Sequence, residues 1–354
     1  MLKKLSGQSV MAFIAVLTAL LSVVDVSTKA AWQWLQKIDE SQVWALTFGN
    51  EIGMAGVVGR GAFSALIAPD LRKVYTETGK ERPPEYPLVF NVSDMEWNPV
   101  KDQQLSGLAT MPAKPEGSQF QLDQPIMGGT KSYEATPYGL AVEITWEMWR
   151  DDLYAVMKEL SAELKRASRN RQEVDAWSVL NNAFATTDVG FTAAESLCST
   201  AHVGLDGVSR ANRPSPDIGF SVTGTQNAVT RFENMTNERN LPRLMAPTFV
   251  VVAPINKFAA REVLGSGGKP YTADNELNAL LEEDLSWMIA HYLTTNTYWF
   301  MLATKGVHDM NFLWRDHPIF DSFDDPWTRN AIFTSYQRHT KGFGAWRGVD
   351  GSSG

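Results

Sequence analysis

This sequence of 354 residues is poor in cysteine, in long hydrophobic runs and in positive charge. Cys198 is the only cysteine, so no intrachain disulfide can form and packing must hold the fold together, as is typical of a reducing compartment. The most apolar run, residues 10–24, is shorter than the roughly 20 residues that a membrane-spanning helix needs. The net charge of −8 argues against a protein that coats nucleic acid, because such proteins are usually basic, although an acidic protein can still enclose nucleic acid.

Motifs for catalysis and metal binding are also scarce. Cys198 and His202 form the best nucleophile–base pair, but they lie four residues apart in a loop rich in turn residues, and no third group that would orient the histidine is evident. The other histidines are scattered, without the HExxH or CxxC spacing of zinc sites. Residues 265–269 resemble a phosphate loop but place Val263 and Pro270 where the motif requires Gly and Ser or Thr. We therefore expect no catalytic residue, metal or cofactor, and a secreted hydrolase that uses Cys198 and His202 is only an alternative.

The chain does contain one long amphipathic segment, from Asp151 to Phe184. Its apolar residues recur at steps of mostly three or four, charged residues occupy the opposite face, and neither Gly nor Pro interrupts it, which predicts a single α-helix. At 1.5 Å per residue this helix would be roughly 50 Å long. A coiled-coil or bundle helix is the plainer interpretation, but no second helix of similar length is predicted. The segment directly before it, residues 138–149, alternates like a strand.

Residues 76–137 have a different composition. Eight of the 17 prolines fall between Pro83 and Pro137, and polar residues are frequent, although residues 86–92 alternate like a strand. The segment is too polar for a core of its own and too long for an ordinary connection. Its composition fits either a disordered insertion or a long extended hairpin that is buried against another subunit.

The rest of the chain mixes the two kinds of element, so we predict an α+β fold. After a loop rich in turn residues at 196–219, apolar runs predict strands and helical spacing predicts helices. The expected strands are 249–254, 298–303, 311–314 and 330–338, and the expected helices are 222–238, 256–264 and 276–290.

The N-terminus permits two interpretations. The apolar run 10–24, with two lysines ahead of it, resembles a secretory signal peptide. However, the run has a helical stripe, Asp25 follows it directly, and no convincing small-x-small cleavage site comes next. We therefore expect residues 1–31 to be retained as an arm helix, with Val16 and Leu20 in a contact between or within subunits.

Several short stretches, in this order, resemble those of a known family: SDMEW (93–97), PYGLAVEITWEMWRDDL (137–153), LCSTAHVGLDGVSRAN (196–212), VVVAPINKFAAREVLGS (250–266), PYTADNELN (270–278), WFMLATKGVHDMNFLWRDHPIF (299–320) and RHTKGFGAWRG (338–348). Each match is weak alone, but the order is specific. Together they resemble the major capsid proteins of tailed phages with the Hong Kong 97-type fold and, more narrowly, the Mu-type major head subunit family.

The resemblance implies an α+β capsid fold in four parts. These are an N-terminal arm (1–75), an extended loop over a neighbour (76–137), a peripheral domain (138–220, with the spine helix 151–184, and the returning residues 310–354), and an axial domain (221–309). The proline-rich segment fits this scheme, because a segment without its own core can be buried by another copy of the chain.

The resemblance also implies a function. The chain would be a major capsid protein that assembles with itself, as hexamers and pentamers, into an icosahedral shell enclosing double-stranded DNA without sequence-specific binding. Portal and scaffolding proteins would be partners, a decoration protein is left open, and neither a cofactor nor a membrane is implied. Assembly would take place in the host bacterial cytoplasm, and the product would be the virion. An encapsulin-like compartment with a protein cargo is the alternative on the same fold.

Apolar residues of the arm and the extended loop are the expected contacts between subunits. These are Val16, Leu20, Phe90, Trp97, Met111 and Phe120.

Overall fold

The computed structural model describes residues 63–151, 154–192, 195–268, 276–325, 327–328 and 330–354. The arm helix expected near the N-terminus, with Val16 and Leu20, lies outside these residues. In the part of the chain that is described, no helix is both long and apolar enough to cross a bilayer.

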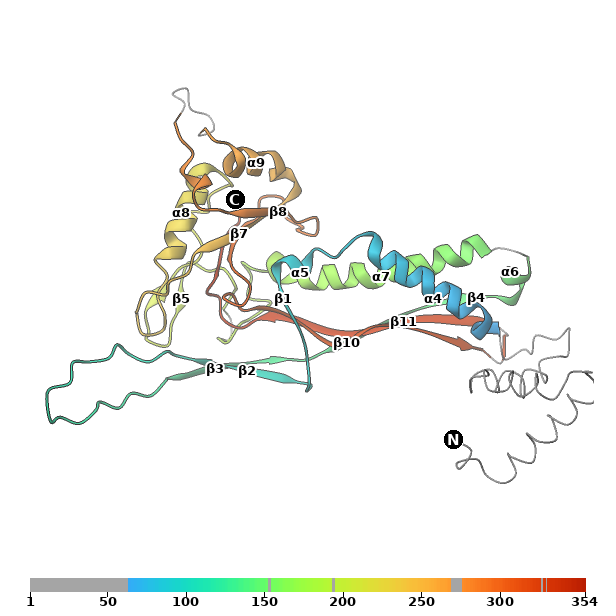
Figure 1. Cartoon of the computed structure of the whole chain (residues 1–354), viewed down its shortest axis with the longest axis horizontal. Coiled ribbons are helices and arrows are strands. Elements are labelled where there is room, and N and C mark those ends of the chain that lie inside the picture. The colour runs from blue at the N-terminus through green and yellow to red at the C-terminus, as the bar shows by residue number, and fades with distance from the viewer. Residues whose placement is uncertain (1–62, 152–153, 193–194, 269–275, 326, 329) are drawn as a thin grey trace, which may run out of the picture. The chain divides into compact units, whose positions relative to one another are not determined.

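The first sheet has the strand order β1–β10–β11–β4 (Figure 1). Strand β1 (Asn91–Asp94) runs parallel to β10 (Met310–Asp324), and β11 (Ala331–Phe343) is antiparallel to both β10 and β4 (Thr136–Ile144). Along β11, buried residues largely alternate with more exposed ones, as expected for a strand with one face on a core. The strands expected at 311–314 and 330–338 are therefore confirmed, within longer strands.

The long helix α7 (Tyr154–Asn181) packs against this sheet together with α4 (Phe63–Glu81) (Figure 1). It lies within the expected helix 151–184 and buries an apolar face that includes Met157, Leu164 and Trp177.

The strand expected at 138–149 is too long by five residues. It ends at Ile144, and Trp146–Arg150 form the short helix α6 instead. The reason is local, because the Thr145 hydroxyl accepts a hydrogen bond from the Met148 N–H at 3.2 Å and so supplies a partner that the first turn of a helix needs.

The second sheet has the order β12–β9–β7–β8. Strands β7 (Pro247–Val252) and β9 (Trp299–Ala303) are confirmed as buried strands, and α8 (Val222–Glu233) and α9 (Lys257–Gly265) are the expected helices, α8 ending earlier than predicted. The last strand, β12 (Val349–Ser352), pairs with β9, so the C-terminal residues join the second sheet rather than returning only to the first.

The helix expected at 276–290 is wrong. The described residues of that stretch form a single 3-10 turn, η4 (Ala279–Leu281), and the strand β8 (Ser286–Ile289). Pairing with β7 over Phe249–Val252 gives β8 its hydrogen bonds, and Asp284 takes a positive φ of 49° that a helix does not allow. Tertiary pairing thus overrides the local helical pattern.

The proline-rich segment divides into two structurally different parts. Its start is not coreless, because Tyr86, Val89 and Phe90 are buried in the same core as Trp177. The alternation at 86–92 predicted a strand, but residues Tyr86–Val89 form the short helix α5. The N–H groups at the start of a helix need hydrogen-bond acceptors outside it. Here the buried Glu173 carboxylate accepts hydrogen bonds from the backbone N–H groups of Glu85 and Tyr86, at 2.5 and 3.2 Å.

The later part of the segment forms an antiparallel hairpin, β2 (Val100–Leu105) with β3 (Met127–Tyr133), which the residues 106–126 connect. The disordered interpretation therefore fails for these strands. A smaller pair, β5 (His202–Val203) with β6 (Ser209–Arg210), lies in the loop before α8.

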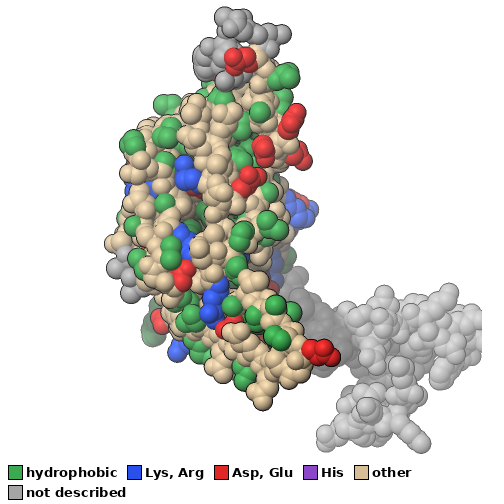
Figure 2. All heavy atoms as spheres, turned by 90° about the vertical axis from the view of Figure 1, so that its left-hand side faces the viewer, with side chains coloured by type: hydrophobic (Ala, Val, Ile, Leu, Met, Phe, Trp, Pro, Cys, Tyr) green, Lys and Arg blue, Asp and Glu red, His purple; other side chains and the backbone are tan. Residues whose placement is uncertain are grey.

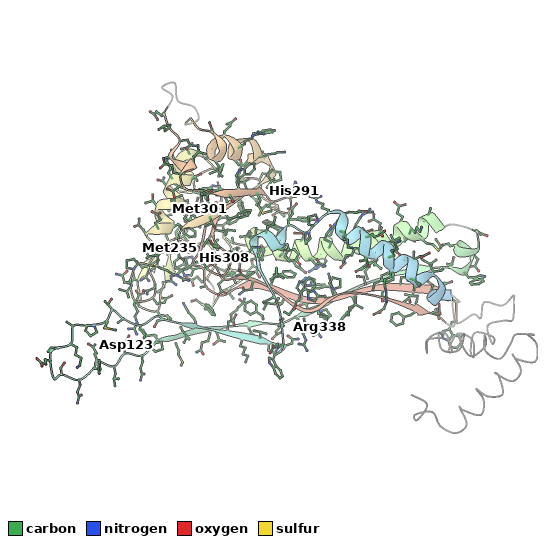
Figure 3. All side chains as sticks on the ribbon, viewed as in Figure 1. Asp123, Met235, His291, Met301, His308 and Arg338 are labelled. Atoms are coloured by element: carbon green, nitrogen blue, oxygen red, sulfur yellow. The ribbon has the colours of Figure 1, made fainter. Side chains whose placement is uncertain are left out.

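His308, in the link from β9 to β10, gives the fold a measurable pH dependence (Figure 3). Burial lowers the pKa of its imidazole from 6.5 to about 4. Between these two pH values the unfolded chain binds a proton that the folded chain does not, so the free energy of unfolding should fall by up to about 3 kcal/mol as the pH drops through this window.

We expect His308→Gln to flatten this dependence. The measurement is denaturant unfolding at pH 7 and pH 4.5 in both proteins, where all other titrating groups are shared. An equal loss of stability in the variant and the parent would show that His308 is not responsible.

Candidate assembly interface

The hairpin β2–β3 carries the largest set of exposed apolar side chains, and Figure 1 shows its connecting residues projecting away from both sheets. Met111 and Phe120 are 91% and 80% exposed, and Trp97, just before the hairpin, is 76% exposed. In Figure 2, which faces the left-hand side of Figure 1, hydrophobic side chains lie at the surface of the lower end of the molecule. Soluble monomers rarely expose apolar side chains in such a group, so this surface is suited to a protein partner. Its further exposed members are Leu105, Leu108, Leu122, Ile126 and Met127.

Phe90 does not belong to this surface. It is only 1% exposed and packs edge-on against Trp177 at a centroid distance of 6.4 Å. The expectation that it contacts a neighbour is corrected, because the chain's own core already buries its side chain. Trp97, Met111 and Phe120 remain available, and Val16 and Leu20 lie outside the described residues.

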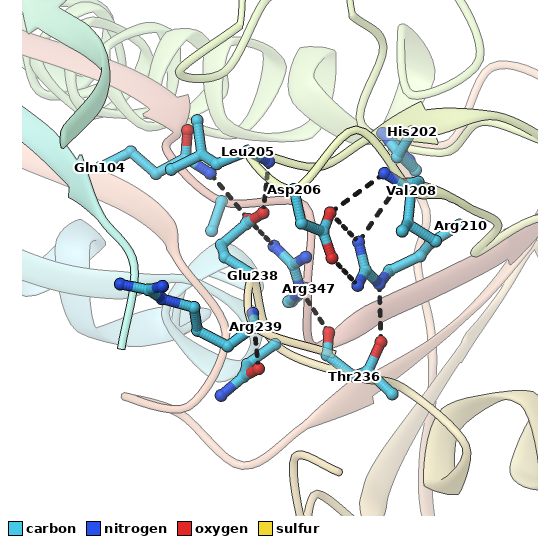
Figure 4. Close-up of polar contacts among 12 residues, drawn as sticks. Gln104, His202, Leu205, Asp206, Val208, Arg210, Thr236, Glu238, Arg239 and Arg347 are labelled. Carbon is cyan, nitrogen blue, oxygen red and sulfur yellow. Dashed lines mark hydrogen bonds and ion pairs between the residues drawn. The ribbon is translucent and has the colours of Figure 1, made fainter. Parts of the chain in front are cut away.

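A polar junction fixes the base of the hairpin to the loop that follows α8 (Figure 4). The carboxylate of Glu238 accepts hydrogen bonds from the Gln104 amide at 2.9 Å, from the Leu205 backbone N–H at 2.7 Å and from the Arg347 guanidinium at 2.5 Å. Arg347 also donates to the Thr236 carbonyl at 2.9 Å. Since Glu238 and Arg347 are both buried, this ion pair joins the hairpin, the loop and the C-terminal segment with little screening by solvent.

A second ion pair stiffens the same region. Arg210 binds both carboxylate oxygens of Asp206, at 2.9 and 2.6 Å, and its Nε donates to the Thr236 hydroxyl at 2.6 Å. The hydrogen bonds from Arg210 lower the pKa of Asp206 to about 2, so the pair stays charged at neutral pH.

The connecting residues are held only near their start and end. Ser106 and Ile126 exchange hydrogen bonds across the hairpin, and the Asp123 carboxylate (Figure 3) accepts one from the Ala109 N–H at 2.8 Å. Arg239 adds three contacts, to the Gly107 carbonyl at 3.3 Å, to Asp123 at 3.2 Å and to the Gln124 carbonyl at 2.7 Å. The residues between these anchors, 110–122, are all exposed, and Lys114 lies over the Phe120 ring within the loop itself.

We expect Arg239→Ala to loosen the connecting residues without unfolding the protein. The ion pair with Asp123 is partly exposed, so the loss of global stability should stay below about 1 kcal/mol. Limited proteolysis with an enzyme that does not cut at Arg or Lys should cleave residues 107–124 faster, whereas Lys114→Ala should leave the rate near that of the parent. Unchanged cleavage in the Arg239 variant would mean that the strands alone hold the loop.

The proposed Cys198–His202 pair does not form. Cys198 is completely buried, and burial raises the pKa of its thiol well above the usual value, so it is not a thiolate nucleophile. The ring nitrogens of His202 contact Glu195 at 2.6 Å and Asn212 at 2.8 Å, and its ring stacks on Trp346. His202 therefore has a structural role, and the signal that sequence spacing gave for a hydrolase was accidental.

The functional residues that the sequence did not reveal are those of the junction. Gln104, Glu238 and Arg347 come from segments far apart in the chain, and of these only Arg347 lies in one of the short stretches quoted above. Among the described residues, no group of three or more His, Cys, Asp or Glu side chains is placed to hold a metal ion.

Comparison with known proteins supplies the family. The model of a family described as phage capsid protein matches residues 129–349, which is more than half of the chain. No curated protein matches the sequence at a significant level.

Three solved structures with a similar arrangement are distant in sequence. The procapsid protein of bacteriophage JBD30 is 12% identical with a TM-score of 0.47, covering 82% of this chain and 75% of that one. The capsid protein of cyanophage P-SCSP1u is 11% identical (TM-score 0.47; 74% and 85% covered), and the virus-like particle from Pyrococcus furiosus is 6% identical (TM-score 0.46; 80% and 97% covered). The family assignment therefore rests on the family model.

Proposed function

The chain belongs to the phage capsid protein family, and we propose that copies of it assemble as hexamers and pentamers into the icosahedral head of a tailed bacteriophage. Within this family we propose a major capsid protein with the Hong Kong 97-type α+β fold, a structural protein rather than an enzyme. The Mu-type head subunits are the relatives that we propose within this family, on the ordered motifs of the sequence.

The observation that carries the proposal is the exposed apolar hairpin. Its base is fixed by the buried ion pair of Glu238 with Arg347, whereas Met111 and Phe120 in the connecting residues are almost fully exposed. A rigid base with an apolar end is suited to reach over a second copy, where burial of these side chains would stabilise the contact by roughly 1.5–3 kcal/mol each. Repeated around a closed symmetry, modest contacts of this kind add up to a stable shell.

The other parts take their roles from the same proposal. We propose residues 1–75 as the N-terminal arm, with Val16 and Leu20 in its contact, and the extended loop within 76–137. The peripheral domain is 138–220 with 310–354, and the axial domain is 221–309, although β12 pairs inside the second sheet.

We propose portal and scaffolding proteins as partners of the shell. Double-stranded DNA would be its contents, bound without sequence specificity. Assembly would take place in the host bacterial cytoplasm, and the product would be the virion.

Negative-stain microscopy of the purified protein is the direct test. Closed shells of uniform size are expected, and sedimentation should show large particles. Sedimentation as monomer or dimer under every assembly condition would contradict the proposal. Particles from infected cells should contain nuclease-protected DNA, and finding a packaged protein instead would favour the encapsulin-like alternative.

A further inference from the structure

The second sheet presents two different exposed surfaces at its two ends. Strands β7 and β8 run parallel, with Phe249 opposite Ser286 and Val252 opposite Ile289. The 3-10 turn η3 (Pro254–Asn256) and α9 follow the carboxyl end of β7, whereas residues 281–285 precede the amino end of β8. Because the strands are parallel, these two surfaces lie at opposite ends of the pair, about 10 Å or more apart.

Helix α9 keeps the two surfaces apart as well (Figure 1). Its first residue adjoins η3, while its far end, about 13 Å away for nine residues, holds the turn η4. There the Asn278 side chain donates to the carbonyls of Val263 and Ser266 at 2.7 and 3.0 Å. Both surfaces are therefore fixed to one short helix.

The surface after β7, here called the basic end, consists of Ile255, Lys257, Phe258 and Arg261, with the exposed Glu262 next to Arg261. All four side chains are exposed, Phe258 to 73%, while Ala260, Val263 and Leu264 form the buried face of the same helix. The exposed Phe258 is thus flanked in the sequence by two exposed cations, Lys257 and Arg261.

The surface before β8, here called the acidic end, consists of Leu277, Leu281, Glu282, Glu283 and Asp284. Leu277 is 88% exposed, and the three carboxylates, which follow it by five to seven residues, are exposed too. Figure 2 shows acidic side chains along one edge of the upper part of the molecule, where the second sheet lies. Within the described part of the chain, no ion pair engages any of these carboxylates, nor Lys257 or Arg261 at the other end.

We propose that the basic end of one copy binds the acidic end of the next copy around a capsomer. The inference rests on the proposed function and specifies which surfaces meet. Two unlike surfaces on opposite ends of one unit give a head-to-tail contact, and such a contact closes into rings when the rotation permits. The opposite charges favour pairing of a basic end with an acidic end over pairing of two ends of the same sign. In this contact Phe258 and Ile255 pack on Leu277 and Leu281 of the next copy.

Charge reversal tests the pairing. Lys257→Glu with Arg261→Glu places two new carboxylates against the three of the acidic end, and Glu282→Lys with Glu283→Lys opposes two new cations to Lys257 and Arg261. Either double variant should reduce the yield of shells by about tenfold or more, because like charges oppose at every contact of the ring. Combining all four substitutions exchanges the two signs and should restore the yield to within about threefold of the parent.

The matched control keeps the charges, as Lys257→Arg with Arg261→Lys, and should assemble like the parent. Thermal melts of the subunits should agree among all variants, because the altered side chains are exposed. If both reversed variants form normal shells, the paired ends are wrong while the proposed function stands. If folded reversed variants fail and the fourfold combination does not recover, the ends do not face each other and the inference is overturned. Failure of the parent to assemble would contradict the proposed function and this inference with it.

A second measurement needs no variant. A zero-length carbodiimide reagent applied to assembled shells joins a lysine to a carboxylate only when the two touch. In shells assembled from mixed light and heavy isotope subunits, we expect peptides that link Lys257 to Glu282, Glu283 or Asp284 of a different copy. Recovery of other intersubunit links without any from Lys257 to these carboxylates would refute the contact.

Discussion

Leu164→Pro is expected to yield insoluble or unassembled protein. Leu164 lies inside α7, is almost fully buried, and packs in the cluster that also contains Tyr75, Phe320 and Phe333. Proline removes a backbone hydrogen bond and clashes with the preceding turn, which costs about 3 kcal/mol or more, and the lost side chain adds roughly 2–5 kcal/mol. Together these reach a large share of the roughly 5–15 kcal/mol by which a domain is usually stable. Solubility and circular dichroism measure the outcome.

The control for this variant is Leu164→Met, which keeps both the volume and the backbone hydrogen bond. It should cost less than about 1.5 kcal/mol and should still assemble. Normal shells from the proline variant would show that residues 154–181 are not one continuous buried helix in the assembled protein.

Replacing residues 110–122 by Gly and Ser of equal length should abolish shells and leave a folded subunit. The replaced segment contains the exposed Met111 and Phe120. The replacement leaves unchanged Ser106 and Ile126, which close the hairpin, and Asp123, which binds Arg239. Because the removed side chains contact little of their own chain, the free energy of unfolding should change by no more than about 0.5 kcal/mol. Sedimentation measures assembly, and a melting curve measures the fold.

A polar variant provides the comparison for this replacement. Changing Lys114, Glu116 and Ser118 to Ala retains the apolar side chains, so it should still form shells. A loss of the cooperative melt in the Gly/Ser variant would instead place the segment in the subunit core. By contrast, extending the replacement to residues 85–125 should unfold the subunit, because it removes Tyr86, Val89 and Phe90 from the core.

The sequence by itself determined the features that depend on local periodicity and on the order of short motifs. The spacing of apolar residues placed the long helix, because one buried stripe at helical spacing has few other solutions. The apolar runs 249–254 and 298–303 predicted the strands β7 and β9, because a strand that is buried on both faces consists mainly of hydrophobic residues with high β-propensity. The motif order indicated the capsid family, which the match over 129–349 supports. Exposure of Met111 and Phe120 followed from the polarity around them.

Only the tertiary structure decided features that depend on distant partners. Residues 86–90 look like part of a coreless loop, but the Glu173 carboxylate caps α5 and Trp177 covers Phe90, and both lie more than 80 residues away in the chain. The stretch 286–289 has a helical pattern, yet β7 offers it the hydrogen bonds of a strand. Cys198 and His202 are close in sequence, but burial of the thiol and the hydrogen bonds of the imidazole keep them from acting together. In the first two cases a long-range contact outweighed a local preference worth about 1 kcal/mol or less per residue, and the local sequence does not contain that contact.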